Sequence, residues 1–87
     1  MYNIITTFKG DSVPFVCHTV SAFNMEHCEI LAFALVNRHF GDIPLEYREH
    51  RQGRFTICSQ GRLVGGVGFG PESEANVDGI RWRVQWG

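Results

Sequence analysis

The chain has 87 residues, of which 44% are hydrophobic and 20% are charged, and its formal net charge is −1. This length predicts a single domain that spans residues 1–87 and has one compact core, and the composition excludes a disordered chain. The near-neutral charge argues against tight, non-specific binding to nucleic acid or to an anionic membrane surface.

The first part of the chain predicts an antiparallel hairpin. Residues 2–8 mix β-branched and aromatic side chains in alternation, so one face of a strand carries Tyr2, Ile4, Thr6 and Phe8. Residues 9–12 form a turn, and residues 13–22 form a second strand. Pro14 near the start of that strand is typical of a sheet edge or of the entry to a strand, and the short connection favours antiparallel pairing.

The next segment, Asn24–Gly41, is the one convincing helix. Asn24 is a good N-cap, Gly41 can adopt the left-handed conformation that ends many helices, and Pro44 prevents the helix from resuming. Helical spacing predicts a sheet-facing stripe of Cys28, Leu31, Ala32, Leu35 and His39. Apolar residues outside that stripe are Ile30, Phe33, Ala34 and Val36. They are covered either by loops and terminal strands or by another molecule, which includes a second copy of the chain.

The second half returns to the alternation of β-strands. Strands are predicted at residues 45–50, 54–58, 62–69 and 80–86, and residues 71–79 form an acidic polar loop. The predicted order is therefore ββαββββ. We expect an α+β fold in which an antiparallel sheet of five to six strands carries one helix, at about residues 24–40, on one face.

Motifs with a defined chemistry are weak in this sequence. The glycines of residues 65–70 lack the following helix that phosphate binding requires, and they indicate a bulge, a bend or a close approach beneath Trp82 or Trp86. Cys17-His18 and His27-Cys28 fit a zinc site poorly, because neighbouring strand residues point to opposite faces. No local signature singles out a catalytic cysteine. We therefore expect that the chain is not an enzyme and that it binds no metal ion and no cofactor.

The basic and apolar surfaces are the remaining candidates for binding. Arg81 and Arg83 form the basic face of the last predicted strand, and Arg48, His50 and Arg62 extend that face. Such a face is either solvated with cross-strand salt bridges, or it binds a protein or single-stranded nucleic acid. The candidate partner-binding residues are Arg48, His50, Arg62, Arg81, Arg83, Ile30 and Phe33.

The junction Val20-Ser21-Ala22-Phe23-Asn24, which leads a hairpin into one amphipathic helix with small residues at Cys28 and Ala32, resembles small phage-encoded anti-CRISPR proteins. The resemblance covers this junction and the order of elements. It implies a non-enzymatic inhibitor that binds a protein surface of a CRISPR effector complex in the bacterial cytoplasm. It transfers no functional residue, and the Arg-rich face departs from the acidic, DNA-mimicking members of that class.

The sequence therefore predicts a small protein-interaction module without an enzymatic activity, and its alternative function is a nucleic-acid-binding domain that uses the Arg-rich sheet face. The three cysteines, an odd number without framework spacing, favour reduced thiols in the cytoplasm. The first ten residues do not have the pattern of a signal peptide, and no apolar run reaches the length of a membrane span.

Overall fold

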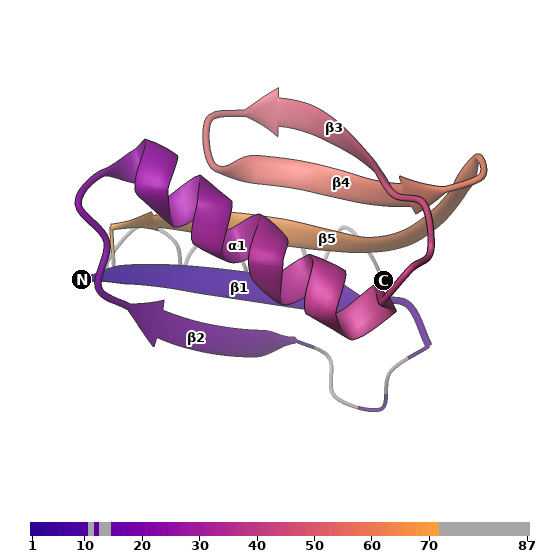
Figure 1. Cartoon of the computed structure of the whole chain (residues 1–87), viewed down its shortest axis with the longest axis horizontal. Coiled ribbons are helices and arrows are strands. Elements are labelled where there is room, and N and C mark those ends of the chain that lie inside the picture. The colour runs from indigo at the N-terminus through magenta and orange to yellow at the C-terminus, as the bar shows by residue number, and fades with distance from the viewer. Residues whose placement is uncertain (11, 13–14, 72–87) are drawn as a thin grey trace.

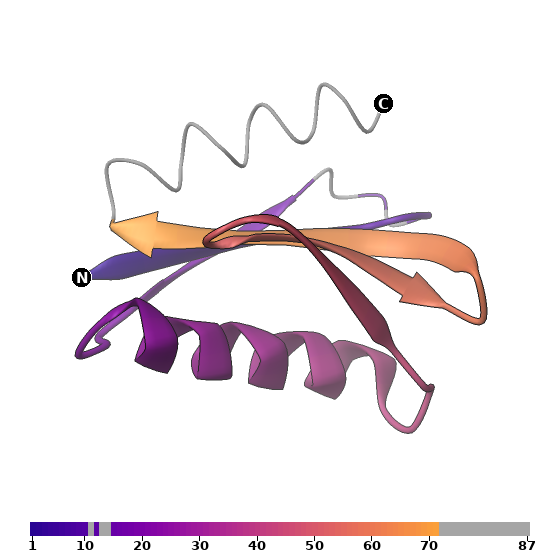
Figure 2. The same cartoon turned by 90° about the horizontal axis from the view of Figure 1, so that it is seen from above.

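The computed structural model describes residues 1–10, 12 and 15–71, which form a five-stranded antiparallel sheet with one helix. The elements are β1 (Tyr2–Phe8), β2 (Val16–Val20), α1 (Met25–Phe40), β3 (Glu46–Arg51), β4 (Arg54–Ser59) and β5 (Arg62–Pro71). The strands are arranged in the order β2-β1-β5-β4-β3 (Figure 1). Helix α1 lies on one face of the sheet (Figure 2). This arrangement confirms the α+β prediction, while the strand predicted at 80–86 lies outside the described residues.

The helix begins and ends where its caps predict. The Asn24 side chain accepts a hydrogen bond from the backbone N–H of His27 at 2.9 Å, and the Asn24 backbone is extended. At the other end, Gly41 has φ +70° and its N–H donates to the carbonyl of Asn37 at 2.8 Å. These bonds satisfy groups that the ends of a helix leave without intrahelical partners. In the part of the chain that the structure describes, no helix is long and apolar enough to cross a membrane.

The core lies between α1 and the helix-facing side of the sheet. Cys28, Ala32 and Val36 form the line of the helix nearest the sheet, and all three are fully buried. They pack with residues of β1, β4 and β5, which are Ile4, Phe55, Ile57, Val67 and Phe69. Because the three helix residues are small, the helix can approach the sheet closely.

The predicted sheet-facing stripe of the helix needs one correction. Val36 is predicted outside the sheet-facing stripe but is fully buried. His39, which is predicted inside the stripe, is exposed, but its ring stacks on that of Phe8 of β1 and so faces the sheet as predicted. The spacing from Cys28 to Ala32 to Val36 is four residues at each step, so the buried line follows these three positions. Leu31 and Leu35 flank this line and are half-buried against the core.

The central strands are buried on both faces. On β1, Ile4 and Thr6 face α1, while Asn3, Ile5 and Thr7 face the opposite side, and all five are at least 97% buried. Gly66, Gly68 and Gly70 of β5 pair with Thr7, Ile5 and Asn3, respectively, and are buried as well. The face away from the helix is therefore not a solvated surface at β1 and β5.

A close approach explains one of the β5 glycines. A Cβ atom at Gly65 would lie 2.6 Å from the backbone oxygen of Thr7, which is closer than real Cβ contacts. Beside Gly65, the pairing of β4 with β5 shifts register between Ile57 and Cys58. The bulge and the close approach agree with the structural interpretation of the glycine run, and the predicted partners Trp82 and Trp86 lie outside the described residues.

Candidate functional site

The predicted partner-binding residues that the structure describes do not lie together in one site. Arg48 and His50 are exposed on β3, where Arg48 pairs with Thr56 and the His50 ring contacts the Thr56 hydroxyl. Arg62 is exposed at the start of β5, beyond the turn that follows β4. Arg81 and Arg83 lie outside the described residues. Of the five residues of the predicted basic face, the structure therefore describes three. Arg48 and His50 lie on the edge strand β3, and Arg62 lies apart from them at the start of β5.

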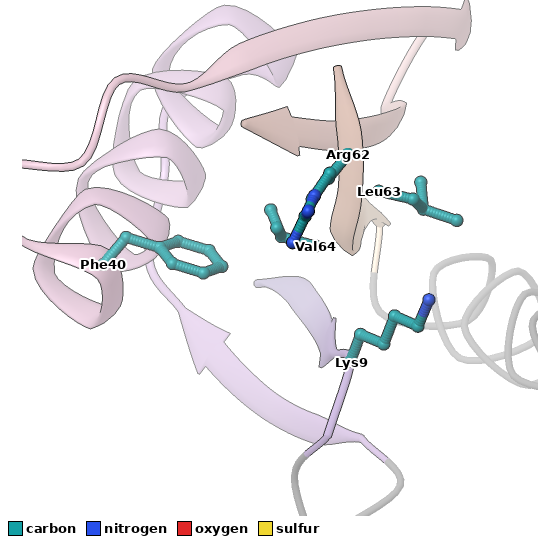
Figure 3. A pocket seen from close by; sticks show the side chains of 5 residues that line it. All are labelled: Lys9, Phe40, Arg62, Leu63 and Val64. Atoms are coloured by element: carbon teal, nitrogen blue, oxygen red, sulfur yellow. The ribbon is translucent and has the colours of Figure 1, made fainter. Parts of the chain in front are cut away.

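Arg62 lines an open hollow of about 560 Å³ near the C-terminal end of α1. Its side chain and that of Val64 extend from β5 toward Phe40, whereas Leu63 and Lys9 extend on the other side of the strand (Figure 3). The Lys9 backbone N–H donates to the Val64 carbonyl at 3.0 Å and fixes this end of β1 against β5. The two cations thus lie on opposite sides of the strand and do not converge on one point.

The two helix residues among the candidates have different environments. Phe33 is half-buried, and its ring lies 4.3 Å from the ring of Tyr47 and 5.1 Å from that of Phe55. Tyr47 also donates from its hydroxyl to the Asn37 side chain at 3.1 Å. Phe33 and Tyr47 therefore close the space between α1 and β3. Ile30 is 62% exposed and points away from the core.

Ile30 belongs to a largely exposed line of side chains on the helix, here called the outer stripe, which consists of Phe23, His27, Ile30 and Ala34. Phe23 is 92% exposed, its ring lies 5.1 Å from the His27 ring, and its backbone N–H donates to His27 Nδ1 at 3.1 Å. These contacts hold an exposed aromatic ring beside the first turn of the helix. The spacing of three and four residues places His27, Ile30 and Ala34 on one side of α1, opposite the buried line, and Phe23, which precedes the N-cap, joins them through its contact with His27.

A cleft of about 290 Å³ opens between β2 and α1, and it is here called the β2 cleft. The residues that line it are Thr6, Phe8, Val16, His18, Leu35, Arg38 and His39. His18 enters from the edge strand because it pairs with Ile4, which faces the helix, and Val16 enters in the same way opposite Thr6. Among the described residues that line the cleft, three can carry a positive charge and none is acidic.

Aromatic stacking fixes one wall of the β2 cleft. The rings of Phe8 and His39 are parallel, with centroids 3.7 Å apart, and the edge of Phe40 packs against both rings. The stack holds His39 over β1 although that residue is exposed.

The β2 cleft is not predicted by the sequence. In the sequence, His18 stands out only as a possible zinc ligand. Arg38 and His39 stand out only as basic residues near the negative end of the helix dipole. Only the pairing of His18 with Ile4, together with the position of α1 over the sheet, brings the three residues together. No local signal in the sequence carries that information.

Two of the three cysteines, Cys28 and Cys58, are buried. Burial raises the pKa of the Cys28 thiol, which favours its neutral form. Cys17 is exposed on β2. Within residues 1–10, 12 and 15–71, no group of three or more His, Cys, Asp or Glu side chains is arranged to hold a metal ion.

Comparison of the chain with protein families, curated proteins and solved structures found no significant match. The candidate surfaces are therefore defined by this structure alone. They are the outer stripe, the β2 cleft and the hollow beside Arg62.

Proposed function

We propose that this chain is a non-enzymatic protein-interaction module that inhibits a bacterial defence complex, as its resemblance to anti-CRISPR proteins implies. In this proposal the outer stripe docks on an apolar patch of a protein subunit of a CRISPR effector complex. The observation that carries the proposal is the exposure of Ile30 on α1 and of Phe23 just before the helix.

Exposed apolar side chains support protein binding because their burial is the main favourable contribution to association. Phe23 is 92% exposed, yet its ring is already oriented by the contact with His27, so little side-chain freedom remains to be lost on binding. Aromatic anchors of this kind are enriched among residues that dominate interface energies. The exposed Ala34 extends the stripe along the helix without introducing a charge.

The test is a phage-plaquing assay in bacteria whose CRISPR system targets the infecting phage. Expression of the wild-type chain should raise plaquing efficiency by orders of magnitude in a strain with the susceptible CRISPR type. Phe23→Glu and Ile30→Glu should abolish this effect. The matched control is Leu63→Glu, which places the same charge at another exposed apolar residue, 42% exposed, away from α1.

Two outcomes would contradict the proposal. If the wild-type chain leaves plaquing unchanged in strains that represent each CRISPR type, the inhibitory function is wrong. If Leu63→Glu abolishes the effect while Ile30→Glu retains it, the outer stripe is not the docking surface. Melting curves of each purified variant separate loss of binding from loss of the fold.

A further inference from the structure

We propose that the outer edge of β2 binds an extended acidic segment of a protein partner, which adds to the sheet as a further strand and places a carboxylate in the β2 cleft. This inference rests on the proposed function, because it names the chemistry of the partner segment. It concerns a different surface from the outer stripe.

The first support is the position of β2 at the edge of the described sheet. Within the described part of the chain, β2 pairs with β1 alone, in an uninterrupted register from Tyr2↔Val20 to Thr6↔Val16. An edge strand presents backbone N–H and C=O groups to any strand that can pair with it. The sequence of β2 is VCHTV, which contains no charged Asp, Glu, Lys or Arg and three β-branched residues. It therefore lacks the charges and bulges with which proteins usually block their edges.

The second support is the position of the β2 cleft beside that edge. Val16 and His18 line the cleft and also belong to the edge strand. A strand added to β2 would lie about 4.8 Å farther out, and every second side chain would point to the face that carries α1. A side chain of the added strand would thus lie next to His18 and within the reach of a long side chain from Arg38. Strand addition typically combines main-chain hydrogen bonds with such side-chain pockets.

The third support is charge. Arg38 supplies a guanidinium group, and His18 and His39 are the other basic residues that line the cleft. Charged groups of the surrounding elements include Lys9 after β1 and the acidic Asp42 after Gly41, both exposed. Because the described lining contains three basic residues and no acid, the side chain that complements it is a carboxylate.

Other occupants fit the same surface less well. In a second copy of the chain paired edge to edge through β2, each copy would bring its own His18 and Arg38 beside those of its partner, which is unfavourable. Nucleic acid would need exposed aromatic faces for base stacking, but one face of Phe8 is covered by His39 and its ring also packs against Phe40. An acidic peptide satisfies both the backbone edge and the cleft.

The experiment uses the full chain and a labelled nine-residue peptide in which Thr and Glu alternate. Fluorescence anisotropy should show binding, and replacement of every Glu by Gln should weaken it about tenfold. Amide hydrogen exchange should slow at β2 and remain unchanged at β3. The variant Arg38→Gln should weaken binding about fivefold, while the matched variant Arg48→Gln on β3 should leave it unchanged.

A second variant keeps the test decisive. Val16→Glu places a carboxylate of the chain itself beside the cleft and should abolish peptide binding, while Val16→Gln should retain it. Val16 is 39% exposed at the start of β2, so both variants should fold, and their melting curves confirm this.

Several outcomes would overturn the inference. These are the absence of peptide binding to the folded wild-type chain, equal binding of the Gln peptide, protection of β3 rather than β2, and displacement of the peptide by a nine-nucleotide single-stranded DNA. Sedimentation that shows a dimer whose contact protects β2 would assign the edge to a second copy and overturn it as well. Restored plaquing without peptide binding refutes this inference alone, whereas peptide binding at β2 without restored plaquing refutes the inhibitory function alone.

Discussion

The two edges of the sheet, β2 and β3, are built in opposite ways. Five of the six residues of β3 are acidic or basic, and its pairing with β4 shifts register between Glu49 and Arg51. Charges and irregular pairing discourage further strands from adding to an edge. β2 has neither feature, since its register with β1 is uninterrupted and His18 is its only basic residue.

The two edges also differ in how the space between the edge strand and α1 is filled. On the β3 side, Phe33 packs against Tyr47, whose hydroxyl bonds to Asn37, and the Ser59 hydroxyl donates to the Pro44 carbonyl at 2.8 Å. On the β2 side the corresponding space is the β2 cleft. One edge is therefore blocked and closed, while the other is regular and open. The charged edge is the kind that resists the addition of further strands, and the regular edge is the one at which we propose strand addition.

The largest expected effect comes from a change in the core between α1 and the sheet, on which both edge strands depend. Ala32→Asp would bury a charge in the fully buried line of α1 and should cost about 4 kcal/mol of unfolding free energy. This loss is close to the total stability of a small domain, so circular dichroism should show an unfolded chain. Ala34→Asp, two residues farther on and exposed, should fold. A folded Ala32→Asp protein would show that the sheet and its two edges do not depend on the packing of Ala32 in the core.

The next effect should distinguish the closed side from the open side. Phe33→Ala removes the ring that packs on Tyr47 and Phe55 and should lower the free energy of unfolding by about 3 kcal/mol. Leu35→Ala, on the side that lines the β2 cleft, should cost about 1 kcal/mol because its surroundings are already open. Denaturant titrations measure both losses. Equal losses would mean that the β2 side is packed as tightly as the β3 side.

Local features of the sequence predict the elements, whereas the contrast between the edges required the structure. The helix is predicted within one residue because Asn24 and Gly41 act within a single turn. The antiparallel hairpin of β1 and β2 follows from a short turn and is confirmed, and β2 lies at one edge of the described sheet, while Pro14 lies outside the described residues. The central position of β5 depends on pairs such as Ile4↔Phe69, which no local pattern reveals.

The candidate site was predictable only in part for the same reason. Ile30 could be recognised as apolar outside the predicted sheet-facing stripe, and it is exposed. Phe33 met the same sequence criterion, but its packing depends on Tyr47, which lies on a strand fourteen residues away in the sequence. The β2 cleft combines His18 with Arg38 and His39 across a helix and a strand. Such a combination arises from packing and leaves no motif.

A smaller effect tests how the closed side is held. Tyr47→Phe keeps the ring on Phe33 but removes the hydrogen bond to Asn37, and it should cost about 1 kcal/mol. Burial raises the pKa of the Tyr47 hydroxyl above its ordinary value of 10.0, so the folded state favours the neutral form. The resulting stability is complete below that ordinary value and is lost as the pH rises from it through the pKa of the folded state.

The wild-type chain should therefore lose stability above about pH 10, and Tyr47→Phe should reduce that alkaline loss. Burial also raises the pKa of Cys28 above its ordinary value of 9.0. The Cys28 thiol therefore adds a second loss of stability with rising pH, which begins at a lower pH than that of Tyr47. Cys28→Ala, introduced both with Tyr47 intact and together with Tyr47→Phe, isolates the tyrosine contribution. Identical pH dependence of these two proteins would contradict the role assigned to this hydroxyl.

The smallest expected effect is the attraction between Arg38 and a carboxylate introduced at the β2 edge. In a double-mutant cycle that combines Val16→Glu with Arg38→Gln, the introduced carboxylate should gain about 0.5 kcal/mol from Arg38, a value typical of exposed pairs. The gain should disappear below about pH 4, where the glutamate is protonated. The matched cycle of Val16→Glu with Arg48→Gln should give no coupling, because Arg48 lies on the opposite edge strand. Coupling to Arg48 and none to Arg38 would mean that the charge of the β2 cleft does not act at the β2 edge, and the assignment of an acidic ligand to that edge would lose its electrostatic basis.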